Sequence, residues 1–190
     1  MAVTKLSFTK IKAGAKASLR YYTHRLTAEG HRTIRDIFDQ YDRITKNQAY
    51  RKIDRAGEYV TFVRMIVSPD PNTEDKDRNL NLRDLTRETV KRLQKILRKK
   101  RTIDYLGIAH TDHSHHRHIH TICFLYGKID PEALRKLHKA ATEESLMQRF
   151  TLSADLAAER PGYHYTRKNP TSRPGTFRQQ NGENLGISAW

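Results

Sequence analysis

The chain has 190 residues, which is enough for one ordinary domain and a tail and excludes a large multidomain machine. Apolar residues make up 36% of the chain and charged residues 30%, so we expect a small core under an unusually polar surface. Thirty-six Lys and Arg residues against 21 Asp and Glu residues give a formal net charge of +15, which favours a polyanionic partner and above all nucleic acid.

Two absences narrow the class of protein further. No run approaches the roughly 18 consecutive apolar residues that a membrane span requires, and the first 20 residues mix charged and small residues, unlike a signal peptide. We therefore expect a cytoplasmic protein without membrane insertion. The single cysteine, Cys123, excludes an internal disulfide and the zinc patterns built on paired cysteines, so any metal must be held by His, Asp or Glu.

The first part of the chain predicts two helices and a strand. Apolar spacing predicts helices over residues 13–26 and 33–55, with Gly30 between them. The β-branched and aromatic run YVTFVRMIV, residues 59–67, predicts a buried strand. This strand should stop at Ser68-Pro69, because proline ends regular strand pairing.

The next part predicts a helix, a pair of strands and a second helix. After a polar, acidic loop, leucine and isoleucine residues at helical spacing predict the clearest helix of the chain over residues 82–100. The runs YLGIA (105–109) and IHTICFLY (119–126) predict two neighbouring antiparallel strands. Pro131, with Asp130 as its cap, then begins a helix that we expect to reach residue 150.

These elements together predict an α+β fold, in which helices flank an antiparallel β-sheet. Residues 1–155 would form this single domain. Residues 156–190 contain much proline and glycine and little periodic apolar sequence, so we expect a basic, extended C-terminal tail.

The predicted helix over residues 82–100 carries a row of basic side chains. Such a row is either a solvated surface or a surface that faces phosphates, and the sequence leaves both interpretations open. The candidates for nucleic-acid contact on this helix are Arg83, Arg87, Lys91 and Lys95.

Six of the ten histidines fall between residues 110 and 120, a density that packing does not explain. Successive side chains alternate faces in a strand, so His118 and His120 share one face while Ile119 points into the core. His110 ends the preceding strand and would complete a three-histidine metal site if the two strands are adjacent. Asp112 could fix the tautomer of a ligand histidine.

An alternative ligand pair, His116 and His118, would place Arg117 on the core-facing side of the strand, so we prefer His118 and His120. We then expect His113, His115 and His116 to be loop residues, either incidental or in contact with substrate, and replacement of His113 or His115 to leave most activity. Adventitious metal affinity is the competing interpretation of such a histidine-rich tract.

The histidine segment resembles the third motif of the plasmid mobilization relaxases, which are HUH endonucleases of the relaxase and mobilization nuclease family. In that motif a histidine and an aspartate precede a His-apolar-His strand, as His110, Asp112 and residues 118–120 do here. The likeness covers roughly residues 1–150 and includes the strand ending in Ser68-Pro69 and the helix that opens with RDLTR.

The sequence departs from the family pattern in two places. Five residues separate Asp112 from His118, one more than is common in the family, and Ile122-Cys123-Phe124 stands where an asparagine is frequent. The long C-terminal region of large relaxases is also missing. The chain therefore resembles a minimal or divergent nicking domain.

The resemblance implies a site- and strand-specific endonuclease that nicks single-stranded DNA during mobilization of a plasmid or mobile element. A tyrosine would attack the phosphodiester and form a 5′-phosphotyrosyl intermediate. The segment LRYYT, residues 19–23, matches the family's first motif, which makes Tyr21 the first choice as nucleophile and leaves Tyr22 and His24 as alternatives. Asp112 would assist catalysis, and Arg20 would contact the DNA.

Other partners follow from the same resemblance or from the composition. Accessory DNA-binding proteins and coupling proteins are implied by the family. Tyr22, Tyr41 and Tyr50 are candidates for stacking on bases of the DNA.

Two arguments about the metal disagree. Three imidazoles with open coordination positions favour Zn²⁺ or another late transition metal such as Ni²⁺. The family instead uses Mg²⁺ or Mn²⁺ for activity, so we expect one of these to support catalysis even if Zn²⁺ or Ni²⁺ is the ion bound.

Two other functions remain open at this point. A three-histidine site would also suit a zinc hydrolase that uses metal-bound water and needs no tyrosine. A basic protein of this size could also be a non-catalytic DNA-binding accessory protein.

Overall fold

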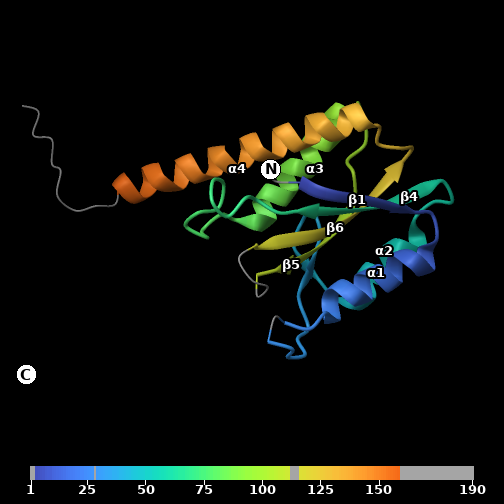
Figure 1. The fold of residues 1–190 in the computed structure, drawn as a ribbon. Helices are drawn as coiled ribbons and strands as arrows, with labels where there is room; N and C mark the ends of the chain where they lie inside the picture. Colours follow the sequence, from blue (N-terminus) through green and yellow to red (C-terminus); the bar gives the residue numbers. More distant parts are fainter. Residues whose placement is uncertain (1–2, 28, 112–115, 159–190) are drawn as a thin grey trace, which may run out of the picture. The chain divides into compact units, whose positions relative to one another are not determined.

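The computed structural model describes residues 3–27, 29–111 and 116–158. These residues form a six-stranded sheet with two helices on each face (Figure 1). The elements in chain order are β1 (Val3–Thr9), α1 (Lys12–His24), β2 (Ile37–Phe38), β3 (Arg43–Ile44), α2 (Lys46–Arg55), β4 (Val60–Val67), α3 (Leu82–Ile96), β5 (Tyr105–His110), β6 (His118–Tyr126) and α4 (Pro131–Ala158).

The strands lie in the order β1-β4-β6-β5-β2-β3, and every neighbouring pair is antiparallel. The predicted α+β fold with an antiparallel sheet flanked by helices is therefore confirmed. The predicted pairing of the two strands around the histidines is confirmed as well, because β5 and β6 are adjacent. Antiparallel pairing places the end of β5, the start of β6 and the end of β4 at the same end of the sheet.

Side chains alternate between two apolar cores, one on each face of the sheet. One core joins α1 and α2 to the sheet through residues such as Leu19, Ile53 and Ile122. The other joins α3 and α4 to the opposite face through residues such as Leu93 and Ile119. In Figure 1, α1 and α2 accordingly lie on one side of the strands, and α3 and α4 lie on the other.

Local signals account for the starts of the helices. The side chain of Asn81 accepts hydrogen bonds from the first backbone N–H groups of α3. Asp130 caps α4 as predicted, because its carboxylate accepts a hydrogen bond from the backbone N–H of Ala133. Thr45 and Gln48 form a capping box that begins α2.

The predicted helix over residues 33–55 is wrong in its first half. The structure has the short strands β2 and β3 there, and the helix begins only at Lys46. The side chain of Asp39 accepts hydrogen bonds from the backbone N–H groups of Tyr41 and Asp42, which stabilises a turn where a helix would need these groups for its own ladder. The spacing of apolar residues cannot distinguish a short hairpin followed by a helix from one continuous helix.

Three further details differ from the sequence interpretation. Strand β1 (Val3–Thr9) was not predicted, because its alternation of charged and apolar residues is weak. Helix α3 ends at Ile96, and Arg98 follows with a φ of 50°, in the left-handed region. Helix α4 continues to Ala158; the remainder of the expected tail lies outside the described residues.

Among the described residues, no helix combines the length and the apolar character that a membrane span needs.

A buried ion pair fixes the start of β6. Arg117 donates to both carboxylate oxygens of Asp75 over 2.8 Å and to the backbone carbonyl of Leu80 over 3.1 Å. The two charged side chains are only 15% and 4% exposed. Arg117 thus lies on the core-facing side of the strand, opposite His118, a position that the preference for His118 and His120 as the ligand pair treats as unfavourable. The charge is accommodated there because the polar loop after β4 supplies Asp75, which holds β6 in place from behind the histidines.

We expect Arg117→Met to lower the free energy of unfolding by about 3 kcal/mol, because Asp75 would remain buried without its partner. Denaturant titration followed by circular dichroism measures this change. The matched control is Lys136→Met, which removes an exposed ion pair with Glu132 and should leave the free energy of unfolding nearly unchanged. Equal, small losses in the two variants would contradict the role given to the buried pair.

Candidate metal centre

The register of the sheet brings three histidines together. His110, the last residue of β5, lies directly opposite His118, the first residue of β6. His120 lies two residues further along β6 and therefore projects from the same face. This face is the one that α1 covers, and Ile119 between the two histidines is fully buried on the other face. The preferred set of His110, His118 and His120 thus forms one cluster.

The cluster has the dimensions of a metal site. One ring nitrogen from each histidine lies within 4.8 Å of the other two, and the ring centroids are 4.6 to 5.1 Å apart. Three imidazoles on one tetrahedral zinc ion, each at about 2.0–2.1 Å, place their ligand nitrogens about 3.3 Å apart. Shifts of about 1 Å in each side chain would therefore close the three nitrogens around one cation.

Backbone carbonyls determine which nitrogen two of the histidines offer. Nδ1 of His118 lies 2.9 Å from the carbonyl oxygen of His116, and Nε2 of His110 lies 2.9 Å from the carbonyl oxygen of Tyr22. A carbonyl can only accept, so these two nitrogens carry the protons and the lone pairs reside on Nε2 of His118 and Nδ1 of His110. Such contacts orient ligand histidines in known metal sites.

The third histidine, His120, is the strongest single sign of a ligand. It is 5% exposed, and among the residues that the structure describes neither of its ring nitrogens has a hydrogen-bond partner. Burial above all, together with the charges of the neighbouring His110 and His118, lowers the pKa of His120 to about 3. The imidazole is therefore neutral at pH 7, which is the form that binds a metal.

Helix α1 contributes Tyr22 to this cluster through two separate contacts. The Tyr22 ring stacks on the His120 ring, with centroids 4.0 Å apart and an angle of 9° between the planes. The Tyr22 backbone carbonyl holds His110. Neither contact uses the tyrosine hydroxyl, whose pKa is raised by burial, an effect that the charge of Arg64 partly offsets. Tyr22 therefore positions two of the three histidines.

Tyr21 lies beside this arrangement but faces outward. Its side chain is 59% exposed, and its ring meets the edge of the Tyr22 ring at 5.8 Å. It lines an open hollow of about 710 Å³ together with Arg20, His24 and Arg25. The candidates Arg20, Tyr21 and His24 therefore share one basic hollow at the end of α1, and Tyr22 packs inward.

The basic residues predicted on α3 do not belong to this centre, because α3 covers the opposite face of the sheet. Arg87 pairs with Asp84, and Lys91 lies 2.5 Å from Glu88. The Arg83 guanidinium lies over the Phe38 ring, 5.1 Å from its centroid. Lys95 is exposed.

The other predicted residues have different outcomes. Asp112, His113 and His115 lie outside the described residues. Tyr41 is 81% exposed in the β2–β3 turn, and Tyr50 lies on α2 beneath the ammonium groups of Lys16 and Lys46. Neither tyrosine contacts the histidine cluster.

Sequence reasoning missed Arg64, which lies on the histidine face of β4. It is half-buried beneath α1, and its Nη1 is 3.4 Å from the hydroxyl of Ser18. Its buried Nε has no hydrogen-bond partner in the described part of the chain. In the register of the sheet, Ile66 rather than Arg64 stands opposite His120, so Arg64 is a diagonal neighbour of that histidine. The available signal was a single arginine inside the apolar run VTFVRMIV.

We expect His120→Ala to reduce zinc affinity at least about a hundredfold, because it removes a ligand rather than an orienting contact, whose loss alone costs 10- to 100-fold. Isothermal titration calorimetry with Zn²⁺ measures the affinity. His138→Ala, a half-buried histidine on α4, is the control and should bind zinc like the unmodified chain. Equal affinity in the two variants would remove His120 from the ligand set.

Tyr22 gives a second, independent test of the centre. We expect Tyr22→Phe to keep zinc affinity, because both contacts to the histidines survive, and Tyr22→Ala to lower it roughly tenfold or more, because the stacked ring is lost. The same calorimetric titration measures both, with Tyr21→Ala as the control on the exposed neighbour. A loss in Tyr22→Phe as large as in Tyr22→Ala would show that the hydroxyl matters.

Comparison with known protein families, curated proteins and solved structures finds no match to this chain. The chemistry of the site therefore follows from its own residues: three imidazoles, a stacked tyrosine, an exposed tyrosine and several nearby guanidinium groups.

Proposed function

We propose that this protein is a metal-dependent DNA-nicking enzyme of the relaxase type, which cleaves single-stranded DNA by transesterification to a tyrosine. The observation that supports this most is the convergence of His110, His118 and His120 beside the tyrosine pair of α1. The sequence resemblance to mobilization relaxases agrees with it in the order of the same residues along the chain. We further propose that the enzyme works in the cytoplasm, where such DNA is processed.

The three histidines would hold one divalent cation through Nδ1 of His110, Nε2 of His118 and one nitrogen of His120. The bound cation would neutralise the charge of a scissile phosphate and polarise its P–O bonds. Mg²⁺ or Mn²⁺ is our proposal for the active ion, while Zn²⁺ and Ni²⁺ suit three imidazoles for binding. Because His120 is neutral at pH 7, no proton needs to be removed from it before the cation binds.

Tyr21 is the better nucleophile of the two tyrosines on physical grounds. Its hydroxyl is accessible to a phosphate that approaches from solvent, whereas the Tyr22 ring is held against His120. Burial also raises the pKa of the Tyr22 hydroxyl, which disfavours the phenolate. The Tyr21 oxygen would bond to phosphorus, the bond to the 3′-oxygen would break, and the proton lost by the tyrosine would be balanced by the proton gained by the 3′-hydroxyl.

Guanidinium groups around the cluster would position the DNA strand. Arg20 and Arg25 line the hollow beside Tyr21, and the charges of Arg25 and Arg35 act on His120. Arg35 is only 8% exposed, and its Nη1 donates to the backbone carbonyl of Arg25, which fixes the segment after α1. Positive charge on this side favours a phosphodiester backbone as the substrate.

The decisive experiment is detection of a covalent adduct. A randomised pool of single-stranded oligonucleotides, labelled at the 3′ end because the adduct retains that fragment, is incubated with the protein and Mn²⁺ and run on a denaturing gel. We expect a protein-linked band with the unmodified chain and its loss in Tyr21→Phe, which removes one oxygen and keeps the ring. Tyr22→Phe should still give the band.

The remaining outcomes identify the rival functions. Cleavage of a 5′-labelled pool without any adduct, including in the Tyr21→Phe, Tyr22→Phe double variant, would indicate a hydrolase that uses metal-bound water. If the protein binds DNA but does not cleave it in the presence of any divalent cation tested, it would instead be an accessory DNA-binding protein. An adduct mapped by mass spectrometry to Tyr22 or His24 would move the nucleophile to that residue.

A further inference from the structure

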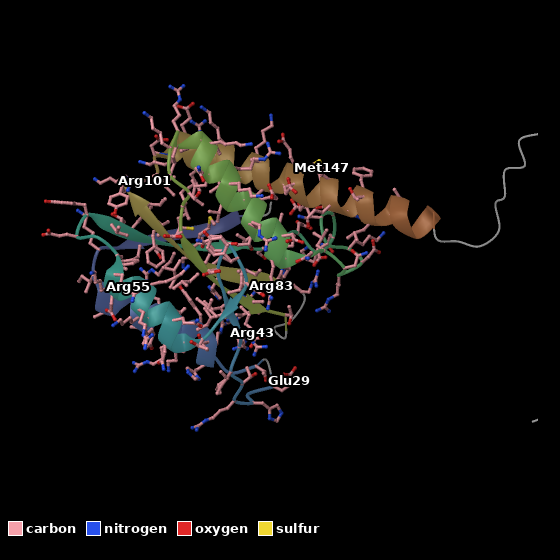
Figure 2. All side chains as sticks on the ribbon, turned by 180° about the vertical axis from the view of Figure 1, so that it is seen from behind. Glu29, Arg43, Arg55, Arg83, Arg101 and Met147 are labelled. Atoms are coloured by element: carbon pink, nitrogen blue, oxygen red, sulfur yellow. The ribbon has the colours of Figure 1, made fainter. Side chains whose placement is uncertain are left out.

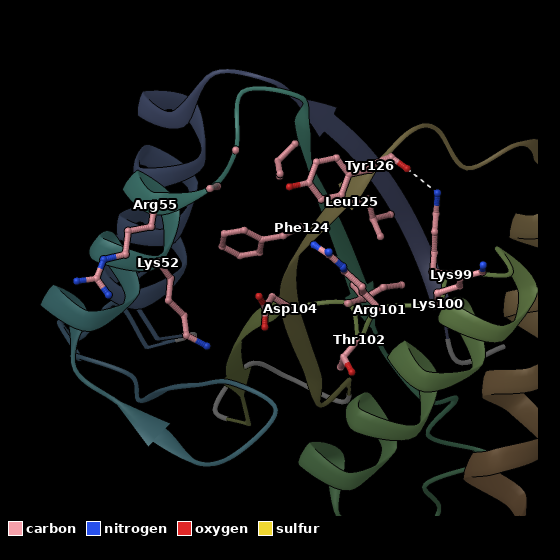
Figure 3. Close-up of a pocket in the computed structure, with 14 residues that line it drawn as sticks. Lys52, Arg55, Lys99, Lys100, Arg101, Thr102, Asp104, Phe124, Leu125 and Tyr126 are labelled. Atoms are coloured by element: carbon pink, nitrogen blue, oxygen red, sulfur yellow. Dashed lines mark hydrogen bonds between the residues drawn. The ribbon is translucent and has the colours of Figure 1, made fainter.

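A second concave site lies at the end of the sheet opposite the histidines. It is a pocket of about 510 Å³ where β4 begins and β6 ends. Its walls come from the end of α2, which supplies Lys52 and Arg55, and from the segment after α3, residues 99–104. Figure 3 shows these two walls on either side of the Phe124 ring, with the Arg101 side chain extending between them.

Positive charge dominates the pocket. Five Lys and Arg side chains line it, against one carboxylate, that of Asp104. The cations are Lys52, Arg55, Lys99, Lys100 and Arg101. In Figure 2, Arg55 and Arg101 lie along the same edge of the molecule, away from Arg43 and Glu29.

Internal partners account for only part of this charge. Lys52 pairs with the buried Asp39 over 2.5 Å, and Asp104 accepts a hydrogen bond from Gln40. Lys99 donates to the carbonyl of Tyr126 over 2.7 Å, which leaves its charge uncompensated (Figure 3). Within the part of the chain that the structure describes, no carboxylate pairs with the remaining three cations, which are Arg55, Lys100 and Arg101.

The pocket also offers flat apolar surface between these charges. Phe124 is half-buried, with its ring packed edge-on against Phe62 at 5.2 Å. Tyr126 is 57% exposed, and its hydroxyl lies so close to Gly57 that a Cβ there would be 3.0 Å away. Rings interleaved with guanidinium and ammonium groups are the combination that binds the bases and phosphates of a single strand.

The basic residues after α3 have an alternative explanation, since cations are favourable near the C-terminus of a helix. That effect falls off within the last turn of the helix. It therefore covers Lys95 better than Lys100 and Arg101, which lie four and five residues beyond Ile96. It also gives no reason for Arg55 on a different helix to face the same pocket.

We propose that this pocket is a second nucleic-acid contact, which binds a phosphate and its base from a single strand, separate from the candidate metal centre. Six residue steps along β6 separate His118 from Phe124, which corresponds to about 20 Å. One extended single strand of nucleic acid could therefore contact both sites only by crossing the face or edge of the β-sheet between them. The identity of the polymer as DNA rests on the proposed function, whereas the binding of phosphate and base does not.

The test measures binding without cleavage. A fluorescein-labelled oligothymidylate is titrated by anisotropy in EDTA over a series of salt concentrations, with Lys100→Gln/Arg101→Gln compared with Lys5→Gln/Arg135→Gln. The control pair is exposed, lies on β1 and α4, and removes the same charge. We expect the slope of log K against log salt to fall by about 1.4 units in the pocket variant, about 0.7 per lost phosphate contact, and much less in the control.

Two further measurements complete the test. One distinguishes the contribution of base stacking from that of charge, and the other distinguishes binding of a nucleic-acid strand from binding of a free nucleotide. Tyr126→Ser should weaken binding roughly fivefold or more without changing the slope, because it removes a stacking surface and no charge. Thymidine monophosphate and inorganic phosphate should compete far more weakly than unlabelled oligothymidylate. Equal competition by the mononucleotide, or equal slopes in the pocket and control variants, would overturn the proposal.

The two proposals fail in distinguishable ways. His120→Ala should leave the salt slope unchanged, because the pocket is remote from the histidines and the titration contains no metal. A chain that binds DNA through the pocket but never forms an adduct would refute the enzyme and retain this contact. A protein that forms the adduct, but whose salt slope is the same in the pocket variant and in the control variant, would support the enzyme and refute this contact.

Discussion

The pairing of β5 with β6 is the interaction on which the candidate centre depends. Because His110 stands directly opposite His118, the two side chains meet without any contribution from a flexible loop. The same ladder continues to β4, so the histidines lie on the central strands of a six-stranded sheet with a buried core on each face. A site built on such strands is held more precisely than one built on loops. This precision comes with a buried imidazole, His120, neither of whose nitrogens has a hydrogen-bond partner within residues 3–27, 29–111 and 116–158.

The sheet also separates two kinds of basic surface. On the histidine face, the guanidinium groups of Arg25 and Arg35 act on the cluster itself, and Arg64 lies beneath α1. On the opposite face, the charges of α3 are largely balanced by neighbouring carboxylates. The number of basic residues on a helix is therefore a weaker sign of nucleic-acid binding than the absence of acidic partners, which among the described residues holds for Lys100 and Arg101.

Much of the centre could be predicted from sequence because strand alternation is a strong local rule. It placed His118 and His120 on one face and Ile119 on the other. The expected antiparallel pairing of the strands on either side of the histidine segment suggested His110 as their neighbour. The contacts of Tyr22 could not be predicted, since they depend on how α1 crosses the sheet. The hairpin of β2 and β3 was missed for a related reason: Asp39 organises a turn through its side chain, and apolar spacing carries no trace of that.

The hydrogen bond between His110 and the carbonyl of Tyr22 ties the end of α1 to the chemistry of the cluster. Tyr22 lies in the last turn of α1, where backbone carbonyls have no partner within the helix. His110 therefore serves as a C-terminal cap for α1 as well as a candidate ligand. A cation that fixes this imidazole would therefore also stabilise the last turn of the helix. By thermodynamic reciprocity, a protein in which this turn is frayed would bind the cation less tightly.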